Sequence, residues 1–185
     1  MLAEKRMEEF FDAGELAVYL GHKGYLRIGI DGIDGVGKTT LANVLSQQLG
    51  YPAIHLDSNL EKNQGGFIDH LDYAGLKSAM EQNERLIVEG VCLMEVLQRV
   101  GVAVDALVYV MRQSHGLWAD ERELNIEGDV EEFIQGEIEL VRRFLQIEGA
   151  DGEVKDLGLS EEIIRYHAAF KPHENANAIY WRKSC

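Results

Sequence analysis

The chain has 185 residues, of which 46% are hydrophobic and 27% charged, a balance typical of a globular domain and not of a disordered chain. Its 32 acidic and 18 basic residues give a formal net charge of -14, so its surface repels nucleic acid and anionic membranes. Two cysteines suggest neither a disulfide framework nor a zinc cluster. We therefore expect a cytoplasmic protein, because the charged start MLAEKRMEEFFDAGEL also lacks the apolar core of a signal peptide.

Hydrophobic periodicity divides the chain into alternating helices and strands. In chain order it predicts a helix within 1–22, a strand over 25–30, a helix over 38–49, a strand over 53–56, a helix capped by Asp72, a strand over 86–88, a helix over 94–100, a strand over 106–111, a helix over 130–147, a helix capped by Ser160 and a strand over 178–181. The strands at 86–88 and 106–111 are continuously apolar, as in strands buried on both faces.

This alternation predicts an α/β fold, a three-layer sandwich with a mainly parallel central sheet and helices on both faces. The chain has no linker rich in Pro, Gly or Ser, so we expect one domain over 1–185. Residues 112–128 lack clean periodicity and follow the end of a strand, where open α/β sheets bind ligands. We interpret this segment as a mobile lid.

A glycine-rich segment, GIDGVGKTT (32–40), joins an apolar strand to an amphipathic helix. It matches the pattern G-x-x-x-x-G-K-[ST], in which backbone N–H groups and a helix N-terminus bind phosphate. Lys38 can reach the β- and γ-phosphates, and the Thr39 hydroxyl can hold Mg²⁺. The residues expected to surround the phosphates of ATP are Asp34, Gly35, Val36, Gly37, Lys38, Thr39 and Thr40.

Two carboxylates follow other strands of the predicted sheet. Asp57 ends the strand in AIHLDSN, and Glu89 ends RLIVEG. Because parallel strands end at the same edge of a sheet, both side chains can face the γ-phosphate. One carboxylate can hold Mg²⁺ and the other can accept the proton of an attacking hydroxyl.

Several segments resemble the uridine kinase and phosphoribulokinase family of P-loop kinases. They are HLDSN (55–59), FIDHLDYAGL (67–76), VEGVCL (88–93) and RYHAAFKPHENANAIYW (165–181). The resemblance implies a P-loop NTPase fold with ATP as phosphoryl donor. It also implies that Asp57 is the catalytic base, that Thr39 and Glu89 serve Mg²⁺, and that the Asp69-His70 segment contacts the acceptor.

The lid of that family usually carries an arginine cluster, and here Arg112 and Arg122 are available. We expect one of them to approach the phosphates. The wording of the glycine loop is nearer to that of thymidylate kinases, so a nucleoside monophosphate kinase remains an alternative. An Asn-Lys-x-Asp guanine motif, which a GTP-driven switch needs, is missing from the sequence.

The leading hypothesis is a kinase that phosphorylates a hydroxyl of a small molecule, a neutral nucleoside or similar riboside. A nucleotide-binding protein without catalysis is a further alternative, and the N-terminal helix leaves a homo-oligomer open. Three histidines, His115, His167 and His173, are too widely spaced for a metal site, and we expect them to face solvent. Trp118 and Cys92 are expected to serve packing.

Overall fold

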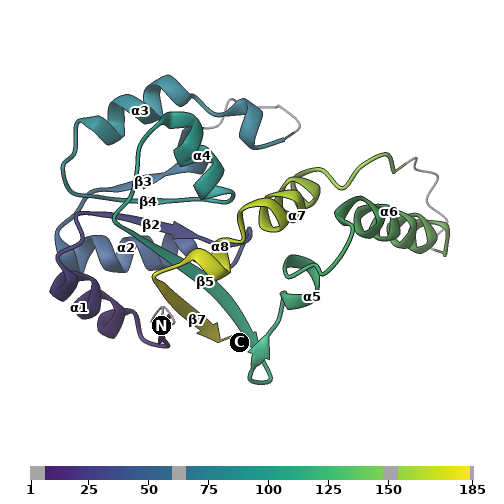
Figure 1. Cartoon of the computed structure of the whole chain (residues 1–185), viewed down its shortest axis with the longest axis horizontal. Coiled ribbons are helices and arrows are strands. Elements are labelled where there is room, and N and C mark those ends of the chain that lie inside the picture. The colour runs from purple at the N-terminus through teal and green to yellow at the C-terminus, as the bar shows by residue number, and fades with distance from the viewer. Residues whose placement is uncertain (1–6, 60–65, 148–153, 184–185) are drawn as a thin grey trace, which may run out of the picture.

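The computed structural model describes residues 7–59, 66–147 and 154–183, and its centre is a seven-stranded sheet. The strand order is β1-β7-β5-β2-β4-β3, and β6 pairs with β5 in the one antiparallel pair among the described strands. The strands are β1 (Glu8–Phe10), β2 (Arg27–Asp31), β3 (Ala53–His55), β4 (Leu86–Glu89), β5 (Ala106–Ser114), β6 (Leu117–Trp118) and β7 (Ala178–Lys183). This mainly parallel sheet confirms the predicted α/β class (Figure 1).

Helices cover both faces of the sheet, which makes the expected three layers (Figure 1). The helices are α1 (Ala13–Lys23), α2 (Lys38–Leu49), α3 (Tyr73–Glu81), α4 (Leu93–Val100), α5 (Glu121–Leu124), α6 (Val130–Ile147), α7 (Leu159–Phe170) and α8 (Pro172–Asn175). Short 3₁₀ turns, η1 (Leu56–Asn59) and η2 (Ile68–His70), follow β3 and precede α3. One apolar cluster joins α1 and α2 to the sheet through residues such as Leu20 and Leu45. A second cluster joins α3, α4 and α7 to the opposite face through Met80, Leu93 and Tyr166.

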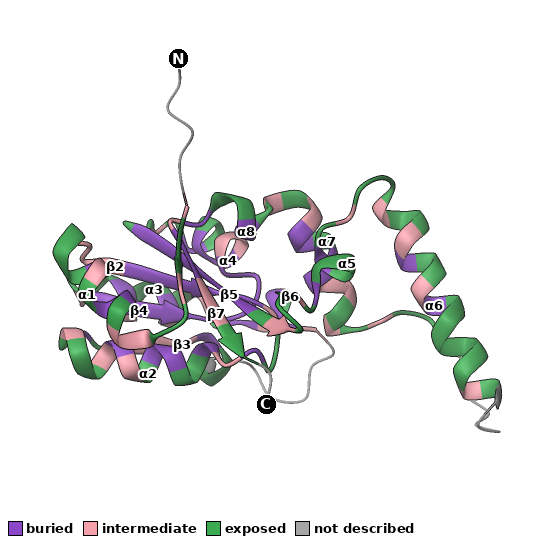
Figure 2. Ribbon diagram, turned by 90° about the horizontal axis from the view of Figure 1, so that it is seen from below, coloured by how far each residue is buried: buried purple, intermediate pink, exposed green. Residues whose placement is uncertain are grey.

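The central strands β2, β4 and β5 are buried because their side chains meet helices on both faces. Gly29 in β2 lets α4 approach closely, since a Cβ there would lie 3.0 Å from Leu93 Cδ2. Helix α6, by contrast, projects from the body, and most of its far half is exposed (Figures 1 and 2). No helix in the described ranges is long and apolar enough to cross a membrane.

The predicted N-terminal helix within 1–22 is partly wrong. Glu8–Phe10 forms β1, which pairs in parallel with β7, and α1 begins only at Ala13. The Asp12 side chain accepts hydrogen bonds from Gly14 N and Glu15 N at 2.8 and 3.0 Å, so it caps α1 and fixes its start. A pairing with a strand at the other end of the chain leaves no local signal. Residues 1–6 lie outside the described ranges.

Two helix starts can be compared with their predicted caps. Asp72 caps α3 as predicted, with Gly75 N donating to Asp72 Oδ1 at 2.9 Å. Ser160 does not cap α7, which begins at Leu159 after Gly158. Gly158, with a positive φ of 57° that favours glycine, stands in the cap position, so α7 begins two residues earlier than a Ser160 cap predicts.

Two of the three histidines are buried, against the expectation that they face solvent. His167 is 1% exposed, and its Nδ1 donates to Ile163 O at 2.7 Å while its Nε2 accepts from the Tyr109 hydroxyl at 2.7 Å. Burial lowers the pKa of His167 to about 4, so the ring is neutral at pH 7. His173 packs beside Trp118, whose predicted packing role fits this contact.

Candidate active site

The glycine loop connects the end of β2 to the start of α2, at the edge of the sheet where the parallel strands end. Gly35 and Gly37 have φ values of 68° and 99°, which favour glycine. Gly37 is the N-cap of α2, and no side chain caps that helix, so the amides of its first turn remain available to an anion. Thr39 and Thr40 lie exposed on this turn, whereas Val36 is buried beneath the loop.

The Lys38 side chain turns back toward the first residues of the glycine loop. Its Nζ donates to Ile33 O at 2.7 Å, and the residue is only 7% exposed. Burial lowers the pKa of Lys38, although nearby carboxylates, with Glu89 the strongest, favour the charged ammonium. Asp34 also turns toward the loop and accepts a hydrogen bond from Gly35 N at 2.8 Å.

Thr39 and Glu89, the predicted Mg²⁺ residues, lie in direct contact. Thr39 Oγ1 donates to Glu89 Oε1 at 2.9 Å, and Glu89 is 2% exposed at the end of β4. His55 Nδ1 lies 2.7 Å from the same carboxylate oxygen. Sequence reasoning missed His55, although the parallel register pairs it directly with Glu89.

A hydroxyl and a carboxylate are oxygen ligands of the kind that Mg²⁺ prefers. Within the described ranges no group of three or more His, Cys, Asp and Glu side chains could hold a metal ion. Mg²⁺ usually binds one or two protein oxygens and completes its octahedron with phosphate oxygens and water.

Asp57 lies in η1, directly after β3. Partial burial raises the pKa of its carboxyl, the negative Glu89 raises it further, and Lys38 opposes both. A carboxylate with a raised pKa is a stronger proton acceptor, and its pKa lies nearer to neutral pH. Asp57 therefore has the electrostatic setting of a general base beside the glycine loop.

Asp31, the last residue of β2, is a buried acid that sequence reasoning missed. It is fully buried, accepts from Gly32 N at 2.7 Å, and accepts from the Tyr166 hydroxyl. Burial raises the pKa of Asp31 to about 6, while the hydrogen bond from Tyr166 opposes this. The same hydroxyl accepts from Met94 N at 3.1 Å. Through the Tyr166 hydroxyl, Asp31 thus connects the start of the loop to α4 and α7. The sequence signal that could have identified Asp31 is an acidic residue at the end of the apolar strand RIGID.

Two of the predicted acceptor residues, Asp69 and His70, lie in η2. Asp69 is exposed and pairs with Arg99 at 2.7 Å, while its neighbour His70 is half-buried. A groove of about 320 Å³ runs between η2, α4 and α7 beside Asp69. Its charged lining residues are Asp69, Glu95, Arg99, Glu162 and Arg165, three acids against two bases.

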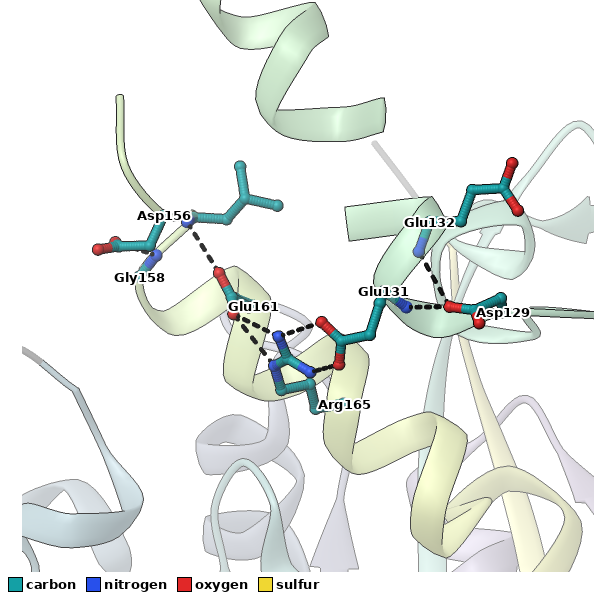
Figure 3. A network of polar contacts seen from close by, with 8 residues as sticks. Asp129, Glu131, Glu132, Asp156, Gly158, Glu161 and Arg165 are labelled. Atoms are coloured by element: carbon teal, nitrogen blue, oxygen red, sulfur yellow. Dashed lines mark hydrogen bonds and ion pairs between the residues drawn. The ribbon is translucent and has the colours of Figure 1, made fainter. Parts of the chain in front are cut away.

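The lid arginines do not meet the loop in this structure. Arg112 pairs with the buried Asp120, and Arg122 Nη2 lies 2.9 Å from Glu137 Oε1. Carboxylates of the lid segment and α6 thus hold both guanidinium groups. Helix α6 is itself tied to α7 by Arg165, which pairs with Glu131 and Glu161 (Figure 3).

A different arginine touches the loop. Arg182 Nη1, near the end of β7, donates to Gly35 O at 3.2 Å. A Cβ at Gly37 would lie 2.6 Å from the same nitrogen, so the guanidinium packs directly on the loop. Sequence reasoning missed Arg182, because the predicted strand ended one residue before it.

No protein-family model matches the chain, and no curated protein matches it. Among solved structures, it is similar to a possible uridine kinase from Bacillus stearothermophilus, with 15% identity, 91% of this chain and 96% of that chain covered, and a TM-score of 0.51. A shikimate kinase from Bacteroides thetaiotaomicron aligns at 21% identity, 84% and 85% coverage, and a TM-score of 0.41. A gluconokinase from Sinorhizobium meliloti 1021 aligns at 17% identity, 81% and 93% coverage, and a TM-score of 0.38. The first of these likenesses shows that the chain has the fold of P-loop kinases.

Proposed function

We propose that this protein transfers the γ-phosphoryl group of ATP to a hydroxyl of a small neutral metabolite, a nucleoside or similar riboside. One observation carries the proposal: three groups needed for this transfer meet at one edge of the sheet. They are the loop with Lys38, the Thr39–Glu89 contact at 2.9 Å, and the carboxylate of Asp57 within electrostatic reach of both Lys38 and Glu89.

In this mechanism the loop amides and Lys38 bind the β- and γ-phosphates, and Thr39 and Glu89 would hold Mg²⁺. When bound, Mg²⁺ neutralises phosphate charge. Asp57 accepts the proton of the acceptor hydroxyl as its oxygen attacks the γ-phosphorus. A new P–O bond forms, the bond between the γ-phosphorus and the β–γ bridging oxygen breaks, and ADP leaves with that electron pair.

The groove beside Asp69 supports a neutral acceptor. Its two arginines are already paired with carboxylates, Arg99 with Asp69 and Glu95, and Arg165 with Glu131 and Glu161. A phosphate on the acceptor would have to displace these acids and would meet a net negative lining. Hydroxyl groups can instead donate to the carboxylates, and such hydrogen bonds contribute roughly 1.5–3 kcal/mol each.

The test is a phosphotransfer assay with ATP and Mg²⁺ on ribonucleosides, other neutral polyols and nucleoside monophosphates. We expect a ribonucleoside to be phosphorylated. The Asp57→Asn variant should lose at least about 100-fold in turnover while ATP affinity is kept, because general-base catalysis contributes about that much. Phosphorylation of a monophosphate alone would establish the alternative kinase class, and absence of transfer to any acceptor would remove the enzymatic proposal.

A further inference from the structure

Arg182 lies against the glycine loop, and the residue is exposed. We propose that Arg182 contacts the phosphate chain of the bound nucleotide and supplies a second cation beside Lys38. This inference rests on the proposed function, because it needs a nucleotide at the loop. It assigns to the terminal strand the task that was expected of the lid arginines.

Acidic side chains surround the loop, so a second cation there would favour the binding of an anionic nucleotide. Four carboxylates act on Lys38, namely Glu89, Asp31, Asp57 and Asp34. A nucleotide triphosphate adds further negative charge to this group, and burial already disfavours the charged form of Lys38. Arg182 places a guanidinium group against the loop as a second cationic side chain.

The Arg182 guanidinium has more N–H donors than its contact with the loop uses. Arg182 Nη1 donates to Gly35 O, whereas a guanidinium has five N–H donors in a planar fork. This fork suits two oxygens of one phosphate. One donor can therefore keep the arginine on the loop while others bind the ligand.

The position of Arg182 is fixed by the sheet. Strand β7 lies between β1 and β5, and at Arg182 it is paired with β5 through Arg112. Next to Arg182, Trp181 Nε1 donates to Glu9 Oε2 at 3.0 Å, and the indole stacks on Phe11 with ring centres 6.3 Å apart. A side chain held in place before binding loses less conformational entropy when it contacts a ligand.

Arg182 and Arg112 share a face of the sheet, and their different partners explain why Arg182 takes this role. The two arginines are paired across the strands, and Val110 and Tyr180, two residues earlier, both belong to the cluster under α1 and α2. Because side chains alternate along a strand, Arg112 and Arg182 start from the same face. Arg112, however, is bound to Asp120, whereas Arg182 is bound to the loop itself.

The experiment measures equilibrium binding of ATP, ADP and adenosine by calorimetry, with Mg²⁺ present, to the whole chain and three variants. Arg182→Ala should lose roughly 10- to 100-fold in affinity for ATP and ADP, as expected for charge-assisted hydrogen bonds, and should bind adenosine unchanged. Arg182→Lys should recover part of the loss. Lys183→Ala, which removes a neighbouring exposed charge, should match the unmodified chain.

Each outcome decides a different claim. If the unmodified chain binds ATP and Arg182→Ala binds it equally well, the inference is wrong while the proposed function stands. If Arg182→Ala weakens adenosine as much as ATP, the arginine supports the loop or the base and not the phosphates. If the unmodified chain binds no ATP, both the inference and the proposed function fail.

Discussion

The buried pair of Asp31 and Tyr166 allows a quantitative prediction for Tyr166→Phe. Tyr166 is 2% exposed, and phenylalanine fills the same space without the hydroxyl. The change leaves Asp31 Oδ2 without the hydroxyl donor and Met94 N without its acceptor. Both groups lie at the junction of the glycine loop, α4 and α7.

The size of the effect follows from these two losses. A hydrogen bond to a charged group contributes about 1.5–3 kcal/mol, and an unsatisfied buried N–H costs about 1–3 kcal/mol. We therefore expect Tyr166→Phe to lower the free energy of unfolding by about 3 kcal/mol at mildly alkaline pH, where Asp31 is ionised.

The loss should depend on pH in a defined direction. The pKa of Asp31 is raised from 3.8 to about 6 on folding, so the folded protein binds this proton more tightly, and the contribution of Asp31 to stability falls as pH rises through that window. The Tyr166 hydroxyl stabilises the ionised form. Without it the pKa of Asp31 rises further, and the penalty of the variant grows with pH.

Urea unfolding followed by circular dichroism at about pH 5 and about pH 8 measures both quantities. The matched control is Tyr109→Phe, which removes another buried hydroxyl, here bonded to the neutral His167. Its loss should be nearly equal at the two pH values, because the pKa of His167 is about 4. An equal loss for Tyr166→Phe at both pH values would refute the assignment of a titrating Asp31.

Three further predictions concern the loop, the metal residues and the lid. Lys38→Ala should weaken ATP binding at least about 10-fold with the circular dichroism spectrum unchanged, because Lys38 gives charge to phosphate and little to the core; unaltered ATP affinity would remove Lys38 from the site. Glu89→Gln should raise the Mg²⁺ concentration needed for half-maximal ATP binding by about 10-fold or more, and an unchanged Mg²⁺ dependence would speak against Glu89 as a metal residue. Residues 112–128 should exchange amide hydrogens more slowly with an ATP analogue and acceptor bound, whereas equal exchange would argue against a lid.

Sequence patterns were sufficient for the parts of the fold whose signals are local. Helix α6 has the predicted bounds, 130–147, because its apolar residues follow helical spacing throughout. The continuous apolar runs gave β4 and β5 because both strands are buried on both faces. Strand β1 escaped prediction because three residues become a strand only by pairing with β7, as Phe10 does with Tyr180.

The difference between local signals and contacts between distant segments also applies to the site residues. Thr39 and Glu89 could be placed together because a glycine loop and the ends of parallel strands share one edge of the sheet. His55 and Arg182 act through register and side-chain direction, which no spacing in the sequence specifies. The ion pair of Arg112 with Asp120 is likewise not specified by the sequence, because the segment 112–128 contains several acidic residues.

Helix α7 contacts three regions: the segment before Asp69, helix α6 and the residue that starts the glycine loop. On one side Glu162 accepts hydrogen bonds from Phe67 N and Ile68 N and so holds the segment that leads to Asp69. The next turn carries Arg165, which pairs with Glu131 of α6 (Figure 3). The same turn carries Tyr166, whose hydroxyl donates to Asp31 at the start of the loop. Because packed interiors resist continuous deformation, a displacement of α7 must break some of these contacts or carry their partners along. The groove beside Asp69, α6 and the glycine loop are therefore joined mechanically through one helix of 12 residues.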